Sequence, residues 1–378
     1  MSRRLAGMLP ARRSLVARLD LARSTGLRHA WRRWRRDRVF AKLIPERRER
    51  VAAALWAEAA SELGAAVRKL AHGQLELRRG SAVTIVRRQL VPLNSPLALE
   101  LAADKPAAYR LLAEAGLPVP EHLAFEAGET GKARAFLADG PLPCVVKPAR
   151  GSGGDGVTGE ISRPRELRRA VLAASRFSPR LLIEHQLAGE VFRFLVLDGR
   201  VLDVVRRSPP AISGDGHSSV EELIFAEYER RIRDDSGPGL KPFVVDLDTI
   251  FSLRRAGIRL RAVPPAGAIV RLKTVTNYNR AEENQTVRTA VSTELEAEIA
   301  SAVAVLGLRL AGVDVVATTV AASLAASGGA IIDVNGHPAL HHHAQVADAQ
   351  GATRVAVPVL RALLEAPRQA RAASPVES

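Results

Sequence analysis

The sequence predicts a protein of the α/β or α+β class, in which helices flank a mixed sheet. Short apolar runs rich in β-branched residues alternate with stretches of helical periodicity. Of the 378 residues, 47% are hydrophobic and 25% are charged, which are ordinary values for a globular protein. This composition excludes a disordered, collagen-like or coiled-coil protein, and a chain of this length is expected to form two or three domains or subdomains.

Five stretches are predicted to be helices, because apolar residues recur every three or four positions among good helix formers. Asp104 is the expected N-cap of the second helix, which should end at Gly116. The predicted helices are 51–72, 105–116, 164–175, 292–306 and 355–364.

The predicted strands are short runs of β-branched and aliphatic residues. Asp198-Gly199 favours a tight turn between two of them. The uncharged stretch 315–332 is interpreted as two buried strands joined by a Ser-Gly-Gly turn, because hydroxyl residues and glycines interrupt it too often for a membrane-spanning helix. Residues 236–239 are expected to form a mobile loop. The predicted strands are 82–86, 143–148, 181–184, 191–196, 201–205, 312–317 and 331–335.

The basic residues are concentrated at the N-terminus. The net charge of the whole chain is +15, and residues 1–50 contribute sixteen basic and four acidic residues to it. We expect one or two basic amphipathic helices there. They should pack on the chain's own body or on a second subunit of a homo-oligomer; the alternative is contact with nucleic acid or an anionic membrane. Arginines interrupt any apolar run near the N-terminus, so we expect no secretory signal and a cytoplasmic protein.

A glycine-dense loop, 151–157, follows the predicted strand 143–148. Its glycines would let backbone N–H groups approach an anion closely, although the loop is neither a Walker A sequence nor a dinucleotide fingerprint. Lys147 lies just before the loop and favours phosphate binding over a plain hairpin turn. Glu184 ends a later apolar strand and is followed by His185, Gln186 and Leu187, an arrangement that suits contact with an adenine.

Two later strands carry oxygen ligands. Asp314 lies in one of them, and Asp333 and Asn335 lie in the other. Residues two apart in a strand face the same side, so Asp333 and Asn335 should point together. Two carboxylates and an amide suit Mg²⁺ that bridges nucleotide phosphates; the alternative is a set of solvent-facing polar residues on an edge strand. The single cysteine, Cys144, excludes a disulfide framework within the chain and a cysteine-based zinc site.

Together these motifs resemble the ATP-grasp carboxylate–amine ligases over roughly residues 80–365. The resemblance is strongest to the ATP-grasp module of cyanophycin synthetase and of bifunctional glutathione synthetase, and more distant to D-alanine–D-alanine ligase. It rests on the order of Asp104-Lys105, Gly-Leu-Pro-Val-Pro at 116–120, Val-Val-Lys-Pro at 145–148, the glycine loop, Ile-Glu at 183–184, Asp314 and Asp-Val-Asn at 333–335. Ser-Gly-Asp-Gly-His-Ser-Ser at 213–219 and the segment 263–277 point to the cyanophycin-like branch.

The resemblance implies an ATP-grasp fold in which two α+β subdomains clamp ATP, with a basic helical extension before them. The implied divisions are a basic helical region, a linker, a subdomain with the phosphate loop, a subdomain with the metal site, and a tail: 1–75, 76–104, 105–185, 186–366 and 367–378. A domain like the Mur-ligase domain of cyanophycin synthetase is not expected, and neither is a cyanophycin polymerase.

The resemblance also implies a role for each matched residue. Nucleotide contacts are expected from Lys105, Lys147, Gly151, Ser152, Gly153, Gly154, Gly156, Val157, Glu184, His185, Leu187 and Glu190. Mg²⁺, in two ions, should be held by Asp314, Asp333 and Asn335. The transferred phosphate and the acyl phosphate should face Arg193, Arg206 and Lys273. Substrate contacts are expected from Ser213, His217, Asn277 and His337.

Four positions depart from the family pattern. Asp333 replaces the commoner glutamate, Val191 replaces the ribose-binding carboxylate so that Glu190 would substitute for it, and Lys273 replaces an arginine. Residues 278–284 stand where the family has a glycine-rich substrate loop. His341, His342 and His343 are interpreted as part of a substrate-loop wall; a separate metal site or a base for the amine is the alternative.

The implied reaction joins a carboxylate of an amino acid or small peptide to an amine, through an acyl phosphate, with ADP and phosphate as products. Two alternatives remain on the sequence. One is a phosphotransferase that uses the same nucleotide site. The other is a protein that binds nucleic acid or a membrane and has a degenerate ATP-grasp body.

Overall fold

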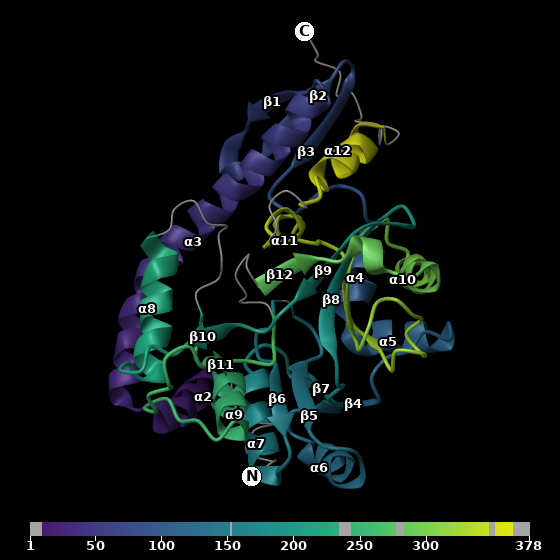
Figure 1. Cartoon of the computed structure of the whole chain (residues 1–378). Coiled ribbons are helices and arrows are strands. Elements are labelled where there is room, and N and C mark those ends of the chain that lie inside the picture. The colour runs from purple at the N-terminus through teal and green to yellow at the C-terminus, as the bar shows by residue number, and fades with distance from the viewer. Residues whose placement is uncertain (1–9, 152, 234–242, 277–282, 348–351, 366–378) are drawn as a thin grey trace.

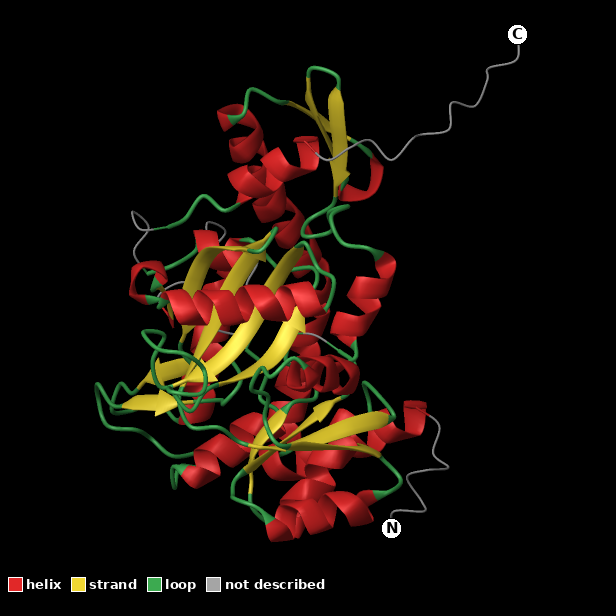
Figure 2. Cartoon of the chain, turned by 90° about the vertical axis from the view of Figure 1, so that its right-hand side faces the viewer, coloured by secondary structure: helices red, strands yellow, loops and turns green. Residues whose placement is uncertain are grey.

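The structure is a computed structural model, and it describes residues 10–151, 153–233, 243–276, 283–347 and 352–365. Within these residues the chain forms four sheets with helices packed on their faces, and the paired strands are antiparallel (Figures 1 and 2). The predicted combination of helices and strands is confirmed, but the predicted mixed sheet is wrong, because every strand pair in these residues is antiparallel. The predicted loop at 236–239 lies outside the described residues.

The central sheet has five strands in the order β12–β9–β8–β13–β14. Asp198 and Gly199 have φ angles of 48° and 77° and make the predicted tight turn between β8 and β9. Helix α10 (Thr293–Val305) packs across one face (Figure 2), and its buried residues share one hydrophobic core with those of α4 (Pro96–Ala103), α5 (Lys105–Glu114) and the sheet. The strands are β8 (Glu190–Leu197), β9 (Arg200–Arg207), β12 (Asn284–Thr286), β13 (Leu310–Ala317) and β14 (Ala330–Asn335).

A second sheet has four strands in the order β4–β7–β5–β6. The glycine loop connects two of its neighbouring strands, β5 and β6. Helices α6 (Thr130–Asp139) and α7 (Pro164–Ala174) pack on this sheet and bury its apolar side chains. The strands are β4 (His122–Glu126), β5 (Cys144–Pro148), β6 (Thr158–Ile161) and β7 (Arg180–His185).

A smaller unit lies between β9 and β12 in the chain. Strands β10 (Ala211–Ser213) and β11 (Ile269–Arg271) pair in it, and helices α8 (Val220–Arg233) and α9 (Leu247–Arg255) share its core. Helix α9 also contributes Leu247 and Phe251 to the core of the four-stranded sheet. The small unit is therefore joined to that sheet by buried apolar contacts.

The basic N-terminal segment is helical, as predicted, and forms α2 (Pro10–Thr25) and α3 (Leu27–Glu62). Helix α3 runs alongside α8, and α2 lies beside α7 (Figure 1). The last turns of α3, with Trp56 buried in them, pack on a three-stranded sheet and on the C-terminal helix. These elements are β1 (Ala66–Lys69), β2 (Leu75–Arg79), β3 (Ala82–Val86) and α12 (Ala356–Glu365).

The predicted helix 51–72 is wrong beyond Glu62. Gly64, with a φ angle of 64°, follows the helix, and the N–H of Ala65 donates to the carbonyl oxygen of Ala60 at 2.8 Å. This geometry ends the helix as in other left-handed glycine caps. The following residues form β1, which pairs with β2. Pairing with the next strand in the chain has therefore overridden local helix propensity.

The stretch 315–332 contains the two predicted strand segments, but their connection is longer than a tight turn. Strand β13 ends at Ala317 and β14 begins at Ala330. The intervening segment is held by a hydrogen bond from Thr318 Oγ1 to the carbonyl oxygen of Ser327, at 2.8 Å, and by the buried side chain of Leu324. None of the helices in the described part of the chain has both the length and the apolar run that a bilayer crossing requires.

Candidate nucleotide and metal site

Three charged side chains form a row across the central sheet. Arg193 in β8 faces Asp314 in β13, and Asp314 faces Asp333 in β14, as partners in the antiparallel register. The guanidinium of Arg193 donates to both oxygens of Asp314, from Nε at 2.5 Å and from Nη2 at 2.6 Å. Burial disfavours a charge on Arg193, but the charge and hydrogen bonds of Asp314 outweigh it and raise the arginine pKa. The sheet thus places a bidentate ion pair next to a second carboxylate.

Lys105 contacts the end of this row of charged side chains, at Asp333. It is the first residue of α5, and Asp104 caps that helix by accepting the N–H of Ala107, as predicted. The Lys105 ammonium lies 2.9 Å from Oδ1 of Asp333 and donates to the carbonyl oxygen of Gly151 at 3.1 Å. The start of α5, the glycine loop and β14 therefore converge on one buried ammonium.

The charge of Asp333 is maintained by its neighbours. Burial opposes ionisation of this carboxyl, but the charge and hydrogen bond of Lys105, with the charges of Lys147 and Arg193, lower its pKa. Asn335 lies two residues further along β14 and donates through Nδ2 to Oδ2 of Asp333 at 3.1 Å. The predicted common orientation of Asp333 and Asn335 is confirmed.

Lys147 and Glu184 form a second buried ion pair. They lie on the adjacent strands β5 and β7, with 2.8 Å between Nζ of Lys147 and Oε2 of Glu184. Lys147 also donates to the hydroxyl of Tyr109 at 2.7 Å and to the carbonyl oxygen of Ile332 at 3.2 Å. The ammonium therefore joins the four-stranded sheet to the strand that carries Asp333.

Tyr109 is a site residue that the sequence did not predict. Its hydroxyl lies 3.2 Å from Glu184 and donates to the carbonyl oxygen of Ile332 at 2.7 Å. Burial, followed by the charge of Glu184, raises its pKa well above the ordinary value, so it remains a neutral hydrogen-bonding group. In the sequence, Tyr109 could have been found from its position four residues after Lys105, which puts both on the same face of one helix.

The glycine loop has the backbone freedom that its composition predicted. Gly151, Gly153, Gly154 and Gly156 have φ angles of 143°, 70°, 72° and 77°, in which side chains are strained. Within the loop, the N–H of Val157 donates to the carbonyl oxygen of Gly154 at 3.3 Å. Ser152 lies outside the described residues. Because Gly151 also accepts from Lys105, the loop begins at the buried cluster.

The segment expected to contact adenine has its two side chains on opposite faces of β7. Glu184 faces Lys147, whereas the His185 ring stacks on Phe136, with 4.3 Å between ring centroids. The N–H of His185 donates to the carbonyl oxygen of Glu121 at 3.1 Å. Leu187 follows the strand. The His185 ring therefore anchors the segment to α6, and Glu184 alone of this pair faces the cluster of Lys147.

Two of the three residues expected to face the transferred phosphate have partners other than the row of charges. Arg206 in β9 donates to Glu190 at 3.2 Å and to the side chain of Gln285. The Lys273 ammonium, almost fully buried, pairs with Asp246 at the start of α9. Arg193 is the one of the three that lies in the row.

The predicted substrate residues are dispersed along the chain. Ser213 ends β10 and is exposed, and the His217 side chain is 80% exposed, with Nε2 at 3.2 Å from Asp215. His337 follows β14 and is half-buried, and burial lowers its pKa. Asn277 lies outside the described residues. Of these four, His337 is nearest in the chain to the carboxylates of β14.

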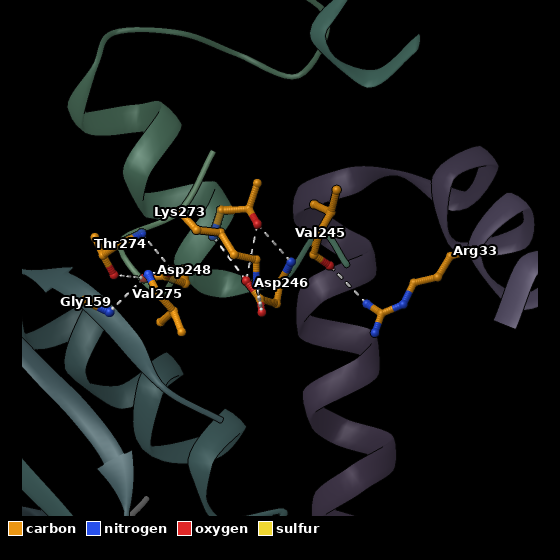
Figure 3. A network of polar contacts seen from close by, with 9 residues as sticks. Arg33, Gly159, Val245, Asp246, Asp248, Lys273, Thr274 and Val275 are labelled. Carbon is orange, nitrogen blue, oxygen red and sulfur yellow. Dashed lines mark hydrogen bonds and ion pairs between the residues drawn. The ribbon is translucent and has the colours of Figure 1, made fainter. Parts of the chain in front are cut away.

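Asp248 forms a polar network that the sequence did not predict (Figure 3). Its carboxylate accepts the N–H of Gly159 at 3.0 Å, the N–H and hydroxyl of Thr274 at 3.0 and 2.6 Å, and the N–H of Val275 at 3.3 Å. The residue is fully buried, and burial, followed by the charge of Asp246, raises its pKa. One side chain thus joins β6, which follows the glycine loop, to the segment next to Lys273.

The histidines after β14 make a buried contact of a different kind. His343 Nδ1 lies 2.7 Å from Oδ2 of Asp203, and the other carboxylate oxygen accepts from the hydroxyls of Thr286 and Thr353 at 2.9 and 3.1 Å. In the described segments, no group of three or more histidine, cysteine, aspartate or glutamate residues has the arrangement of a metal site. His343 therefore stabilises the packing of the segment that follows β14 on strand β9.

The oxygen donors of β13 and β14 are of the chemical type that suits a magnesium ion. Asp314 and Asp333 are register partners, and Asn335 donates through Nδ2 to Asp333, so the three side chains lie on one side of the sheet. Both carboxylates are paired with cations, Asp314 with Arg193 and Asp333 with Lys105. To bind both carboxylates, a metal ion would have to replace Arg193 at Asp314 and Lys105 at Asp333.

Comparison with known proteins finds relatives of this chain. Residues 111–217 match the family described as the D-ala D-ala ligase C-terminus. The cyanophycin synthetase of Nostoc sp. is 34% identical over 273 residues, which are 68% of this chain and 28% of that protein. The glutathione biosynthesis bifunctional protein of Enterococcus faecalis is 27% identical over 302 residues, which are 78% of this chain and 39% of that protein.

The fold has a counterpart among solved structures. A bifunctional glutathione synthetase from Pasteurella multocida superposes with a TM-score of 0.50 and 20% identity, over 79% of this chain and 42% of that one. The chain spans about a third of the length of the curated relatives it matches. The chain thus has an ATP-grasp domain of the D-Ala–D-Ala ligase C-terminal type and is a homologue of cyanophycin synthetase and the bifunctional glutathione biosynthesis proteins.

Proposed function

We propose that the protein is an ATP-dependent ligase that joins a carboxylate to an amine through an acyl phosphate. The carboxylate would belong to an amino acid or small peptide. One observation carries the proposal: three buried cations, Lys105, Lys147 and Arg193, converge with two carboxylates, Asp314 and Asp333. Such a cluster offers cations to the phosphates of a nucleotide and oxygens to a metal ion in the same place.

Each group in the cluster has a role in this proposal. Lys105 and Lys147 would bind phosphate oxygens together with N–H groups of the glycine loop, and Arg193 would face the transferred phosphate. Glu184 would contact the adenine or ribose. Asp314, Asp333 and Asn335 would hold Mg²⁺, which neutralises phosphate charge and makes the γ-phosphorus more electrophilic.

The chemistry requires no covalent bond to the protein. A carboxylate oxygen of the substrate attacks the γ-phosphorus, the bond to the β-phosphate oxygen breaks, and ADP leaves. The nitrogen of the amine then attacks the acyl carbon, the bond from that carbon to the phosphate oxygen breaks, and the amide forms as the nitrogen loses a proton. Positioning of the reactants and stabilisation of charge in the transition state should supply most of the rate enhancement. Loss of one such contact raises the activation free energy by about 3–4 kcal/mol, which lowers the rate by a few hundred-fold.

Two residues are proposed to join the cluster only when the protein closes on its substrates. Lys273 and Arg206 would face the transferred phosphate, and this requires that they leave Asp246 and Glu190. Ser213, His217, Asn277 and His337 are proposed to contact the substrate.

ADP formation measured against panels of amino acids, small peptides and amines, with mass spectrometry of the products, tests the proposal. We expect ADP and phosphate in equal amounts and an amide product whose mass is the sum of the two substrates less water. Phosphate release should require the amine. A phosphorylated acceptor as the final product, formed without an amine, would show a phosphotransferase instead.

A further inference from the structure

The two N-terminal helices are anchored to the body by one face. On α2, Asp20 pairs with Arg169 of α7 at 2.7 Å. On α3, His29 lies 2.9 Å from Glu221 of α8. Further along α3, the guanidinium of Arg36 is buried over the ring of Tyr228, 3.9 Å from its centroid. These contacts place both helices on the outside of the molecule with a defined orientation, as expected for helices that pack on the chain's own body.

The opposite face of each helix exposes large apolar side chains. Leu15 and Leu19 on α2 are 59% and 53% exposed, and Trp31 and Trp34 on α3 are 58% and 56% exposed. Spacings of four and three residues put each pair on one side of its helix. Two of the three tryptophans in the protein are therefore exposed on one side of α3, whereas the third, Trp56, is buried.

The same surface is basic. Arg35 lies over the ring of Trp31 and Arg38 over that of Trp34, at 5.9 and 4.9 Å from the ring centroids. Asp37 is already in ion pairs with its neighbours Arg33 and Arg36. We call the exposed apolar residues and arginines on this side of the two helices the N-terminal face: Leu15, Arg18, Leu19, Arg23, Arg28, Trp31, Trp34, Arg35 and Arg38.

The neighbouring helix α7 is also basic. Arg169, which anchors α2, also lines a cavity of about 350 Å³. Its other lining residues are Arg163, Arg165, Glu166, Arg168 and Arg254. A cavity with five arginines and one carboxylate beside the anchored helix is complementary to an anionic group such as a phosphate.

We propose that the N-terminal face binds the surface of an anionic lipid bilayer. Indole rings with adjacent guanidinium groups suit the headgroup region, where apolar and charged surfaces are close together. Leu15 and Leu19 decide between a bilayer and a nucleic acid, because aliphatic side chains gain from contact with acyl chains and match nothing on a phosphate backbone. Arginines add an attraction to acidic headgroups of roughly fivefold in affinity per residue. Binding at the interface requires no membrane-spanning helix.

Vesicle flotation with the full chain tests this proposal. Vesicles of phosphatidylcholine alone are compared with vesicles of equal parts phosphatidylcholine and phosphatidylglycerol, at low and high salt. We expect the protein to float with the anionic vesicles at low salt and to remain below the neutral ones. Tryptophan emission should shift to shorter wavelength on addition of anionic vesicles. Absence of flotation with anionic vesicles, or equal flotation with neutral ones, overturns the proposal.

Two double variants and two matched controls separate this surface from a general charge effect. Trp31→Ala with Trp34→Ala should abolish the emission shift and weaken flotation, and Arg35→Gln with Arg38→Gln should weaken flotation by roughly 30-fold. The controls are Leu97→Ala with Ile269→Ala, at side chains 67% and 72% exposed, and Arg68→Gln with Arg110→Gln. Equal loss in the controls would contradict a specific face.

Other occupants of the face have distinct signatures. A second copy of the chain would appear in analytical ultracentrifugation as a dimer that the tryptophan variant dissociates. A nucleic acid would appear as a salt-dependent gel shift that the arginine variant weakens, with no flotation. Either result in place of vesicle binding overturns the proposal. None of these outcomes depends on whether the ATP-grasp body is active, since ADP formation is measured separately.

Discussion

The ammonium of Lys105 lies 2.9 Å from the carboxylate of Asp333. In the same way, Arg193 holds both oxygens of Asp314. The side chains proposed to bind phosphate therefore neutralise the side chains proposed to bind metal. A nucleotide with its metal offers each group a new partner, because the metal takes the carboxylates while the phosphates take the cations. The metal alone would leave the cations without partners, and the nucleotide alone would leave the carboxylates without partners.

Mg²⁺ and nucleotide should therefore bind strongly only together. By calorimetry, we expect weak binding of Mg²⁺ alone and tight binding in the presence of a non-hydrolysable ATP analogue. Lys105→Met should strengthen binding of Mg²⁺ alone by roughly tenfold, because it removes a cation from a metal ligand, and should weaken nucleotide binding. Lys132→Met, at a side chain that is 71% exposed, is the control. Unchanged or weaker Mg²⁺ binding by Lys105→Met would contradict the partner exchange.

Asp333→Ala should abolish ADP formation with every substrate pair. The variant loses a metal ligand and the partner of Lys105, and we expect a loss of at least a few hundred-fold. Asp198→Ala is the matched control, since Asp198 also pairs with a cation, Arg309 at 2.7 Å, but lies in the exposed hairpin turn. Thermal unfolding of both variants checks that they are folded. Wild-type turnover by Asp333→Ala would refute its assignment as a metal ligand.

Gly140→Ala should disturb the nucleotide segment through His185. A Cβ at Gly140 would lie 2.2 Å from the His185 ring, whereas a Cβ at Gly131 would meet no atom within 4 Å. The two glycines lie at opposite ends of α6, and neither has a positive φ angle. We expect Gly140→Ala to lose about 1–3 kcal/mol of unfolding free energy by overpacking and to raise the KM for ATP.

Gly131→Ala serves as the matched control for this prediction. It should leave the KM unchanged and add about 0.5–1 kcal/mol of stability, as alanine does in place of glycine within a helix. Denaturant unfolding and initial-rate kinetics measure the two effects. An equal KM in both variants would show that the His185 ring does not position the nucleotide segment.

Local signals predicted much of the fold. The turn at Asp198 and Gly199, the N-cap at Asp104 and the strands that carry Lys147, Asp314 and Asp333 all depend on residues close in sequence, and the structure confirms them. The helix predicted for 51–72 was wrong in its last part, because pairing of β1 with β2 is not encoded in helix propensity.

The candidate site was predictable only where side chains project from regular strands. Asp333 and Asn335 share a face for that reason. The partners of Lys147 and Asp248 were not predictable, because these contacts join distant segments: Tyr109 lies 38 residues from Lys147, and Gly159 lies 89 residues from Asp248. The resemblance to a known family supplied the functional roles but could not show which charges neutralise one another.

Stability should fall as the pH falls below about 6.5, and His341 should contribute to this loss. Burial, with the charges of Arg48 and Arg207, lowers the His341 pKa to about 4. The folded state then binds fewer protons than the unfolded state between these two values, so acidification favours unfolding. At pH 5.5 the single histidine should cost about 1 kcal/mol of unfolding free energy relative to pH 7.5.

Denaturant unfolding of His341→Gln at the two pH values tests this contribution. The variant should lose less stability on acidification than the native protein, because glutamine binds no proton in either state. His217→Gln is the control for replacing a histidine at an exposed position, since its side chain is 80% exposed. His343 should also contribute to the loss of stability on acidification, because burial lowers its pKa even though Asp203 opposes the shift. The His341 variant should therefore reduce the pH dependence without removing it, and an unchanged dependence would mean that His341 is not held neutral by burial.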